Sequence, residues 1–227
     1  MLALLYDVHG NLPALDAVLA DADTAGASGW ILGGDYALFG GWPAETVERL
    51  RGLERASWIR GNGERWTADP DSAPDNAVVP GAIAAARTAL GEATVADLAS
   101  LPFSFPLDGT LICHGSPLSD VRSFEPEPSE EDAELLDGAG ARRVVFGHTH
   151  LPFARWAGEV ELVNPGSVGM PFDGDPRAAY ALLHDSGRIE HRRVGYDHAA
   201  SAERVRSFGE EWAETVARRI EQARMDI

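Results

Sequence analysis

Five short polar clusters come directly after apolar runs in this sequence, and their residue types could bind metal ions. The clusters are DVHGN at 7–11, GGD at 33–35, GN at 61–62, HG at 114–115 and GHTH at 147–150. Together they offer seven side chains with metal-binding atoms: Asp7, His9, Asp35, Asn62, His114, His148 and His150. Imidazole nitrogens mixed with carboxylate and amide oxygens suit divalent ions such as Mn²⁺, Fe²⁺, Co²⁺ or Zn²⁺.

The number of these side chains predicts a site for two metal ions. Seven ligands exceed the four of a tetrahedral zinc site, and they suit two ions that share a bridging carboxylate. Residues two apart, as in Asp7/His9 and His148/His150, lie on one face of an extended backbone. Two such ions supply hydroxide near neutral pH and stabilise the attacking and leaving oxygens in phosphate-ester hydrolysis.

The apolar pattern places these clusters at the ends of predicted strands. Strands are expected at 2–6, 30–32 and 57–59, with helices at 12–25 and 43–53 between them. This order predicts an α/β protein whose central strands are parallel. Because open α/β sheets bind ligands beyond the carboxyl ends of their strands, all five clusters could converge on one crevice.

The rest of the chain predicts a second, more antiparallel sheet within one domain, 1–227. Its strands are expected at 111–113, 144–146, 153–156, 161–163, 179–183 and 189–194. Further helices are expected at 82–90, 93–100 and 130–137, and residues 67–81 resemble a surface loop. Residues 66–106 could form a helical insertion that covers the site. Val205, Trp212 and Ile220 share helical spacing, which predicts a last helix covering a sheet face.

Composition excludes several classes of protein. The net charge of −17 disfavours long DNA or RNA as a partner, because binding to their backbones depends on Lys and Arg. The single cysteine, Cys113, excludes an internal disulfide framework and a Cys-rich zinc site. The apolar start MLALLYD is too short for a signal peptide, and no segment resembles a membrane span, so we expect a cytoplasmic protein without a membrane anchor. P-loop and dinucleotide-binding motifs are also missing.

The order D-x-H, GD, GN, H, GHxH resembles the calcineurin-like metallophosphoesterases, particularly their small bacterial and archaeal phosphodiesterase-like branch. The five blocks span residues 7–150, and NPGSV at 164–168 resembles that branch as well. The resemblance implies a four-layer α-β-β-α sandwich of two mixed β-sheets flanked by helices. It also implies an enzyme that hydrolyses small phosphate esters by attack of a metal-bridging hydroxide.

The resemblance also implies how the ligands are divided between the two ions. One ion would be held by Asp7, His9, Asp35 and His150. The other would be held by Asp35, Asn62, His114 and His148, with Asp35 bridging and with Asp35, Asn62 and His114 nearest the chemistry. Manganese is the expected metal, with Fe, Co, Ni or Zn as alternatives. Gly61 and Gly63 would let the backbone turn Asn62 inward.

The sequence departs from the family at Gly63, where many members have a histidine that assists the leaving group. Its absence favours phosphodiesters or activated monoesters, and Glu64 and Arg65 are the nearest possible substitutes. Arg65, Trp66 and Tyr36 follow ligand blocks, where they could contact substrate or simply pack.

Two alternatives stay open beside the enzyme. Asn62-Gly63 alone would be typical of a hairpin turn. The whole chain could also be a catalytically weak metal-binding scaffold for protein–protein interaction, although such scaffolds tend to lose ligand histidines and all seven ligands are present here. A homo-oligomer is compatible with the sequence.

Overall fold

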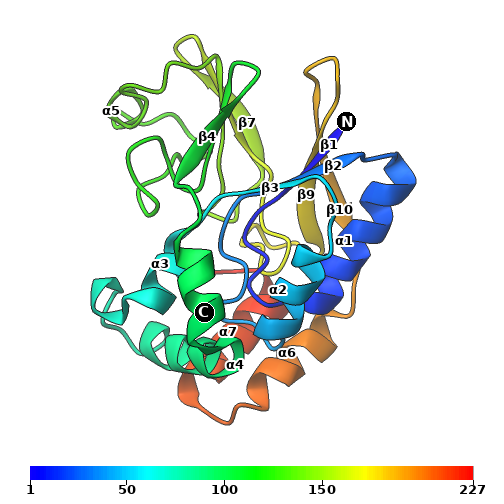
Figure 1. Cartoon of the computed structure of the whole chain (residues 1–227), viewed down its shortest axis with the longest axis vertical. Coiled ribbons are helices and arrows are strands. Elements are labelled where there is room, and N and C mark those ends of the chain that lie inside the picture. The colour runs from blue at the N-terminus through cyan, green and yellow to red at the C-terminus, as the bar shows by residue number, and fades with distance from the viewer. Residues whose placement is uncertain (227) are drawn as a thin grey trace.

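Two mixed five-stranded sheets form the centre of the protein in the computed structural model, which describes residues 1–226 (Figure 1). The first sheet has the order β10-β9-β1-β2-β3, and its strands are β1 Leu2–Leu5, β2 Gly29–Leu32, β3 Ala56–Trp58, β9 Ala178–Leu183 and β10 Ile189–Val194. The second has the order β4-β5-β6-β8-β7, and its strands are β4 Ser104–Leu107, β5 Thr110–Cys113, β6 Arg143–Val145, β7 Phe153–Ala157 and β8 Val160–Asn164.

The inner strands of each sheet are parallel, and the outer strands are antiparallel. β1 pairs with β2 and β2 with β3 in parallel, and β9 and β10 extend that sheet in antiparallel fashion. β5, β6 and β8 are likewise parallel, with β4 and β7 antiparallel at the edges. The predicted α/β class with two mixed sheets is therefore confirmed. The strands expected at 179–183 and 189–194 belong to the first sheet and not to the second, because β9 pairs with β1, and the short edge strand β4 was not expected from the sequence.

The two sheets pack face to face and are covered by helices on their outer faces. Leu4 and Ile31 of the first sheet share an apolar cluster with Ile112 and Val145 of the second. Helices α1 (Leu12–Ala25) and α2 (Pro43–Arg51) cover the first sheet. The second sheet is covered by the short helix α5 (Asp132–Leu135) and adjoining loops. This arrangement gives the four layers that the resemblance implied, with a thin outer layer over the second sheet.

The start of α1 shows how the local sequence fixes an element beside the site. The Asn11 side chain accepts a hydrogen bond from the backbone N–H of Ala14, as an N-cap does, and Gly26 ends the helix with a positive φ of 85°. Leu15, Val18 and other apolar residues of the predicted face are buried. The cap therefore sets the point at which the chain leaves the DVHGN cluster.

The remaining helices gather at one end of the sheets, in the lower half of Figure 1. They are α3 Asn62–Ala68, a 3-10 turn Pro70–Ser72, α4 Val79–Ala99, α6 His198–Arg206 and α7 Glu211–Gln222. The two helices predicted at 82–90 and 93–100 correspond to the two parts of α4, which a kink at Gly91 separates with a φ of 73°, although α4 begins earlier, at Val79.

Three further predictions about helices were wrong in detail. The helix predicted at 130–137 is only the four-residue α5. The last helix is divided into α6 and α7, with Gly209 between them at a φ of 75°. Its apolar face does not cover a sheet, because Trp212 and Val216 pack in one cluster with Ile83 of α4. Along residues 1–226, no helix has both the length and the apolar character needed to cross a membrane.

Candidate metal centre

The seven predicted ligands converge where the parallel strands of both sheets end. Single ligands follow β2, β3 and β5, and a pair of ligands in one loop follows each of β1 and β6. Asp7 and His114 are completely inaccessible to solvent, and only His148 of the seven is more than marginally exposed. Asn62 is the first residue of α3, so the GNG sequence does not form a hairpin turn.

Five of the seven ligands have a backbone conformation that side chains rarely adopt. Their φ angles lie in the left-handed region, at 53° for Asp7, 48° for His9, 57° for Asp35, 68° for His148 and 60° for His150. Strain of this kind persists where the surrounding structure enforces it, and it is concentrated at functional sites. It also corrects the expectation that extended backbone aligns the Asp7/His9 and His148/His150 pairs.

Three imidazole rings are oriented by backbone carbonyl groups. The Nδ1–H groups of His9, His114 and His150 donate to the carbonyl oxygens of Leu38, Gly33 and Met170 at 3.0, 2.8 and 2.5 Å. A neutral imidazole that donates from Nδ1 has an unshared electron pair on Nε2. Such an outward hydrogen bond is the usual partner of a metal-binding histidine. Each Nε2 atom is therefore in the form that binds a metal.

These unshared pairs point at one another. The Nε2 atoms of His9 and His150 are 3.0 Å apart, with no proton to place between them. Asp7 Oδ1 is buried without a hydrogen-bond donor and lies 3.6 Å from His150 Nε2. Because facing acceptors repel unless a cation lies between them, this group of atoms fits a bound metal ion.

Asn62 completes a second group of the same kind. Its amide lies 3.0 Å from His114 Nε2 and 2.8 Å from His148 Nδ1. When the amide NH₂ faces these nitrogens, it can donate to both, and Oδ1 then accepts from the backbone N–H of Gly63. With Oδ1 facing them instead, Oδ1 and His114 Nε2 are two acceptors 3.0 Å apart, as around a cation. His114 Nε2 is an acceptor in both orientations, because its Nδ1–H donates to the carbonyl oxygen of Gly33.

Two carboxylates connect the groups. Asp7, His9 and His150 have ligand atoms within 4.8 Å of one another, and so do Asp7, Asp35 and His114. Asp35 Oδ2 lies 3.8 Å from His9 Nε2, and its Oδ1 lies 3.5 Å from His114 Nε2. The two oxygens of Asp35 thus face one group each, which is the geometry that a bridging carboxylate requires. Asp7 also lies close to both groups.

Burial sets the charge of these side chains. It raises the pKa of Asp7 to about 8, an effect that His114 opposes and Asp35 reinforces. Burial, with the nearby charge of Glu64, also raises the pKa of Asp35 well above its usual value. It lowers the pKa of His9 and of His148 to about 3. The imidazoles of His9 and His148 are therefore neutral, and divalent cations would supply the positive charge that the buried carboxylates lack.

Glu64 holds the centre together from behind, a role that the sequence did not reveal. Its carboxylate accepts hydrogen bonds at 2.8 Å from the backbone N–H groups of Asp35, Tyr36 and Gly61. Both oxygens are occupied and only 4% of the residue is exposed. Glu64 consequently cannot replace the missing histidine as a proton donor. Its place two residues after the ligand Asn62 was the signal available in the sequence.

The NPGSV segment supports the ligand loops through its polar side chains. The Asn164 side-chain amide donates to the carbonyl oxygen of Gly147, next to His148, at 3.0 Å. Ser167 Oγ donates to the carbonyl oxygen of Asp7 at 2.7 Å. This segment therefore connects two ligand loops that are far apart in the sequence.

Glycine is required on both sides of Asn62 because Asp35 leaves no room for a side chain there. A Cβ atom on Gly61 would lie 2.2 Å from Asp35 Oδ1, and one on Gly63 would lie 2.9 Å from the same atom. Neither residue has a positive φ, which corrects the expectation that they provide an unusual turn. A histidine at 63 would thus displace Asp35.

The three predicted substrate contacts have different outcomes. The prediction that Tyr36 contacts the substrate was wrong, because Tyr36 is fully buried and its hydroxyl group contacts the backbone carbonyl oxygens of Leu32 and Ile59. Arg65 makes two hydrogen bonds of 2.7 Å with Asp120, so its guanidinium is already paired and is poorly placed to protonate a leaving group. Trp66 lines a cavity beside the ligands.

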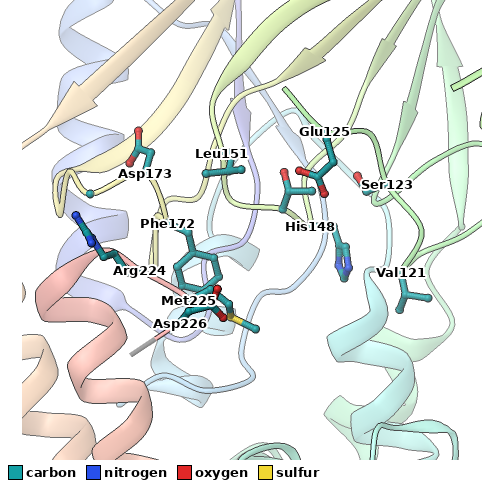
Figure 2. A pocket seen from close by; sticks show the side chains of 12 residues that line it. Val121, Ser123, Glu125, His148, Leu151, Phe172, Asp173, Arg224, Met225 and Asp226 are labelled. Atoms are coloured by element: carbon teal, nitrogen blue, oxygen red, sulfur yellow. The ribbon is translucent and has the colours of Figure 1, made fainter. Parts of the chain in front are cut away.

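Three cavities adjoin the predicted ligands, and one of them, of about 470 Å³ beside Arg65 and Trp66, reaches only His148. An inner cavity of about 540 Å³ is lined by five of the ligands, together with mostly apolar side chains; these ligands are His9, Asp35, Asn62, His148 and His150. An outer cavity of about 810 Å³ is more polar, with Glu125 and Asp173 on its walls (Figure 2). His148, Phe172 and Met225 line both the inner and the outer cavity, so these two meet at an edge of the candidate centre.

Comparisons with known proteins agree with this geometry. The model of the calcineurin-like phosphoesterase superfamily domain matches residues 1–188. An uncharacterized protein of Methanocaldococcus jannaschii is 30% identical over 90% of this chain and 91% of its own. The phosphodiesterase YfcE of Escherichia coli is 31% identical over 81% of this chain and 88% of its own. A metallophosphoesterase from Sphaerobacter thermophilus has a crystal structure that covers 98% of both chains with a TM-score of 0.84 and 26% identity.

Proposed function

Because the chain belongs to the calcineurin-like phosphoesterase superfamily, we propose that it is a two-metal enzyme that hydrolyses small phosphate esters, with a preference for diesters. The convergence of unshared pairs from His9, His150 and the unpartnered oxygen of Asp7 carries this proposal. Buried acceptors that face one another need a cation, and neutral imidazoles with carboxylates are suitable ligands for one.

The ligands are proposed to divide as in the family. Asp7, His9, Asp35 and His150 would hold one ion, and Asp35, Asn62, His114 and His148 the other. When bound, two divalent ions supply hydroxide near neutral pH and stabilise the charge that develops on the phosphate oxygens. The chain itself orients the imidazoles through carbonyl groups and fixes Asp35 through the hydrogen bonds of Glu64 to its neighbours. Manganese is the proposed metal.

Two features favour diesters. Neither Glu64 nor Arg65 is free to protonate a leaving group, so esters with a stable leaving anion should react best. The inner and outer cavities meet at His148 and offer separate space for the two organic groups of a diester. The relative in Escherichia coli is named a phosphodiesterase.

Hydrolysis by metal-free and metal-loaded protein tests this function. Protein treated with EDTA and then supplied with Mn²⁺ should hydrolyse bis-p-nitrophenyl phosphate, and more efficiently than p-nitrophenyl phosphate, whereas the metal-free protein should be inactive. Faster turnover of the monoester would contradict the preference for diesters. Bound Mn²⁺ without turnover of either ester would favour the scaffold.

Matched variants assign the activity to the centre. Asp35→Asn and His148→Ala should each abolish turnover while leaving the fold largely intact. His184→Ala is the control, because His184 pairs with Glu190 outside the centre and should be dispensable. Full activity in both ligand variants would refute the proposed mechanism.

A further inference from the structure

The inner cavity has an apolar wall that could contact the organic group of a phosphate ester bound at the predicted ligands. Besides these polar ligands, it is lined by Phe39, Trp66, Val78, Val79, Met170 and Phe172. Two of these rings also pack on the ligands: Phe172 stacks on His150 with ring centres 4.4 Å apart, and Phe39 lies 5.5 Å from His9. Apolar and aromatic side chains therefore begin directly beside the metal ligands.

One cation lies among these apolar groups. Arg219 of α7 lines the cavity. Burial lowers the pKa of its guanidinium, and the nearby charge of Asp226 opposes this effect. Within residues 1–226, its one hydrogen bond is from Nε to the carbonyl oxygen of Met225 at 3.2 Å. The guanidinium has four further N–H groups, which prefer carboxylate, phosphate or carbonyl oxygens as partners. In a protein with a net charge of −17, Arg219 would favour an anionic or carbonyl group in this cavity.

We propose that the inner cavity selects phosphate esters whose organic group is flat and apolar and carries an anionic or carbonyl acceptor for Arg219. This inference rests on the proposed function, since the metal centre would hold the phosphate. Flat rings gain from packing against aromatic side chains, and the size of the cavity is that of a small-molecule site. Residues 74 and 76–79, from the segment proposed as a cover, form part of its wall.

Binding of phosphonates tests the apolar part of this proposal without any need for turnover. Methylphosphonate and phenylphosphonate carry the same metal-binding group and differ in the organic group. In calorimetric titrations of the Mn²⁺-loaded protein, phenylphosphonate should bind about tenfold more tightly or better. Equal affinity would overturn the inference and leave the metal centre intact. No binding of either phosphonate would overturn both the inference and the proposed function.

A third probe tests Arg219. 4-Carboxyphenylphosphonate should bind more tightly than phenylphosphonate to the original protein. Arg219→Gln should remove this additional affinity and keep the preference for phenyl over methyl. If the carboxylate gives no gain, or if the gain survives in Arg219→Gln, the role of Arg219 is refuted.

A variant that fills the cavity provides an independent test. Ala77 is exposed and lines the cavity just before α4, so Ala77→Trp should reduce the preference for phenylphosphonate without disturbing the core. Ala84→Trp is the matched control, because Ala84 is exposed on α4 and does not line this cavity. An unchanged preference in Ala77→Trp, or equal losses in both variants, would contradict the proposed site.

Discussion

At the residue scale, the centre depends on a buried carboxylate that does not touch the metal site itself. Glu64 accepts three backbone hydrogen bonds and so fixes the turn that carries Asp35. In Glu64→Gln, an amide NH₂ would replace one acceptor oxygen and face an N–H donor. We expect the variant to lose about 1–3 kcal/mol of stability, the cost of an unsatisfied buried polar group.

Thermal unfolding in EDTA measures this loss separately from metal binding. Titration with Mn²⁺ should then show weaker binding, because Asp35 is no longer held in place. Glu48→Gln is the control, since Glu48 is exposed on α2 and should change stability by less than about 0.5 kcal/mol. A Glu64→Gln protein as stable as this control would show that the three hydrogen bonds matter little.

A second residue-scale prediction concerns Gly63. Alanine favours a helix more than glycine does, but its Cβ here would lie 2.9 Å from Asp35 Oδ1. Gly63→Ala should therefore weaken Mn²⁺ binding and reduce diester hydrolysis, although α3 itself gains helical propensity. Gly195→Ala provides a comparison, because no atom lies within 4 Å of the added Cβ. Metal binding equal in the two variants would contradict the steric explanation.

At the element scale, the sequence predicted the strands that carry the ligands better than the helices that surround them. Short apolar runs followed by Asp7, Asp35 or His114 identify strand ends, since burial on both faces selects apolar residues. The division of the last helix at Gly209 was missed because the apolar spacing continues from Val205 to Trp212 across the break. Periodicity also could not show that the partner of this face is α4.

The same limit applies to the site. Residue types and strand ends predicted seven ligands, and the structure brings these side chains together. The left-handed backbone of the ligands, the hydrogen bonds of Glu64 and the position of Arg219 depend on contacts between distant segments, which no local pattern encodes. Tyr36 illustrates the converse, because its place beside Asp35 in the sequence indicates nothing about the direction of its side chain.

The contact between α4 and α7 gives a prediction at this scale. A Cβ on Gly81 would lie 2.3 Å from the indole of Trp212, so the two helices approach closely only because residue 81 is glycine. Gly81→Ala should lower stability by about 1–3 kcal/mol through overpacking. It should also reduce the additional affinity for 4-carboxyphenylphosphonate, because α7 carries Arg219. Trp212→Phe in the same chain should recover part of the stability, and an additive double mutant would contradict direct contact.

At the scale of the whole molecule, a strongly acidic protein encloses a site that requires positive charge. The net charge of −17 attracts divalent cations at low ionic strength and repels long polyanions. Buried acceptors at the centre then select cations over other ligands. The global charge thus disfavours long polyanions as partners, and the buried acceptors make the centre suitable for cations.

Metal binding should be coupled to proton release with a definite dependence on pH. In the metal-free protein, burial raises the pKa of Asp7 to about 8, so this carboxyl group holds a proton at neutral pH, and the pKa of Asp35 is raised in the same direction. A metal ion binds the carboxylate form and displaces the proton. His9 and His148, with pKa values lowered to about 3, are already neutral and release none. Affinity for Mn²⁺ should therefore rise as the pH rises towards 8 and level off above it.

Calorimetric titration with Mn²⁺ in buffers of different ionisation enthalpy measures the number of protons released. Near pH 7 we expect about one proton per protein molecule from Asp7, falling as the pH is raised beyond roughly 8, where Asp7 is already ionised. Asp7→Asn should release at least about half a proton less near pH 7, while His184→Ala should match the original protein. If release were instead largest near pH 6 and absent near pH 7, the displaced protons would come from histidines, and the charge assignment of the centre would be wrong.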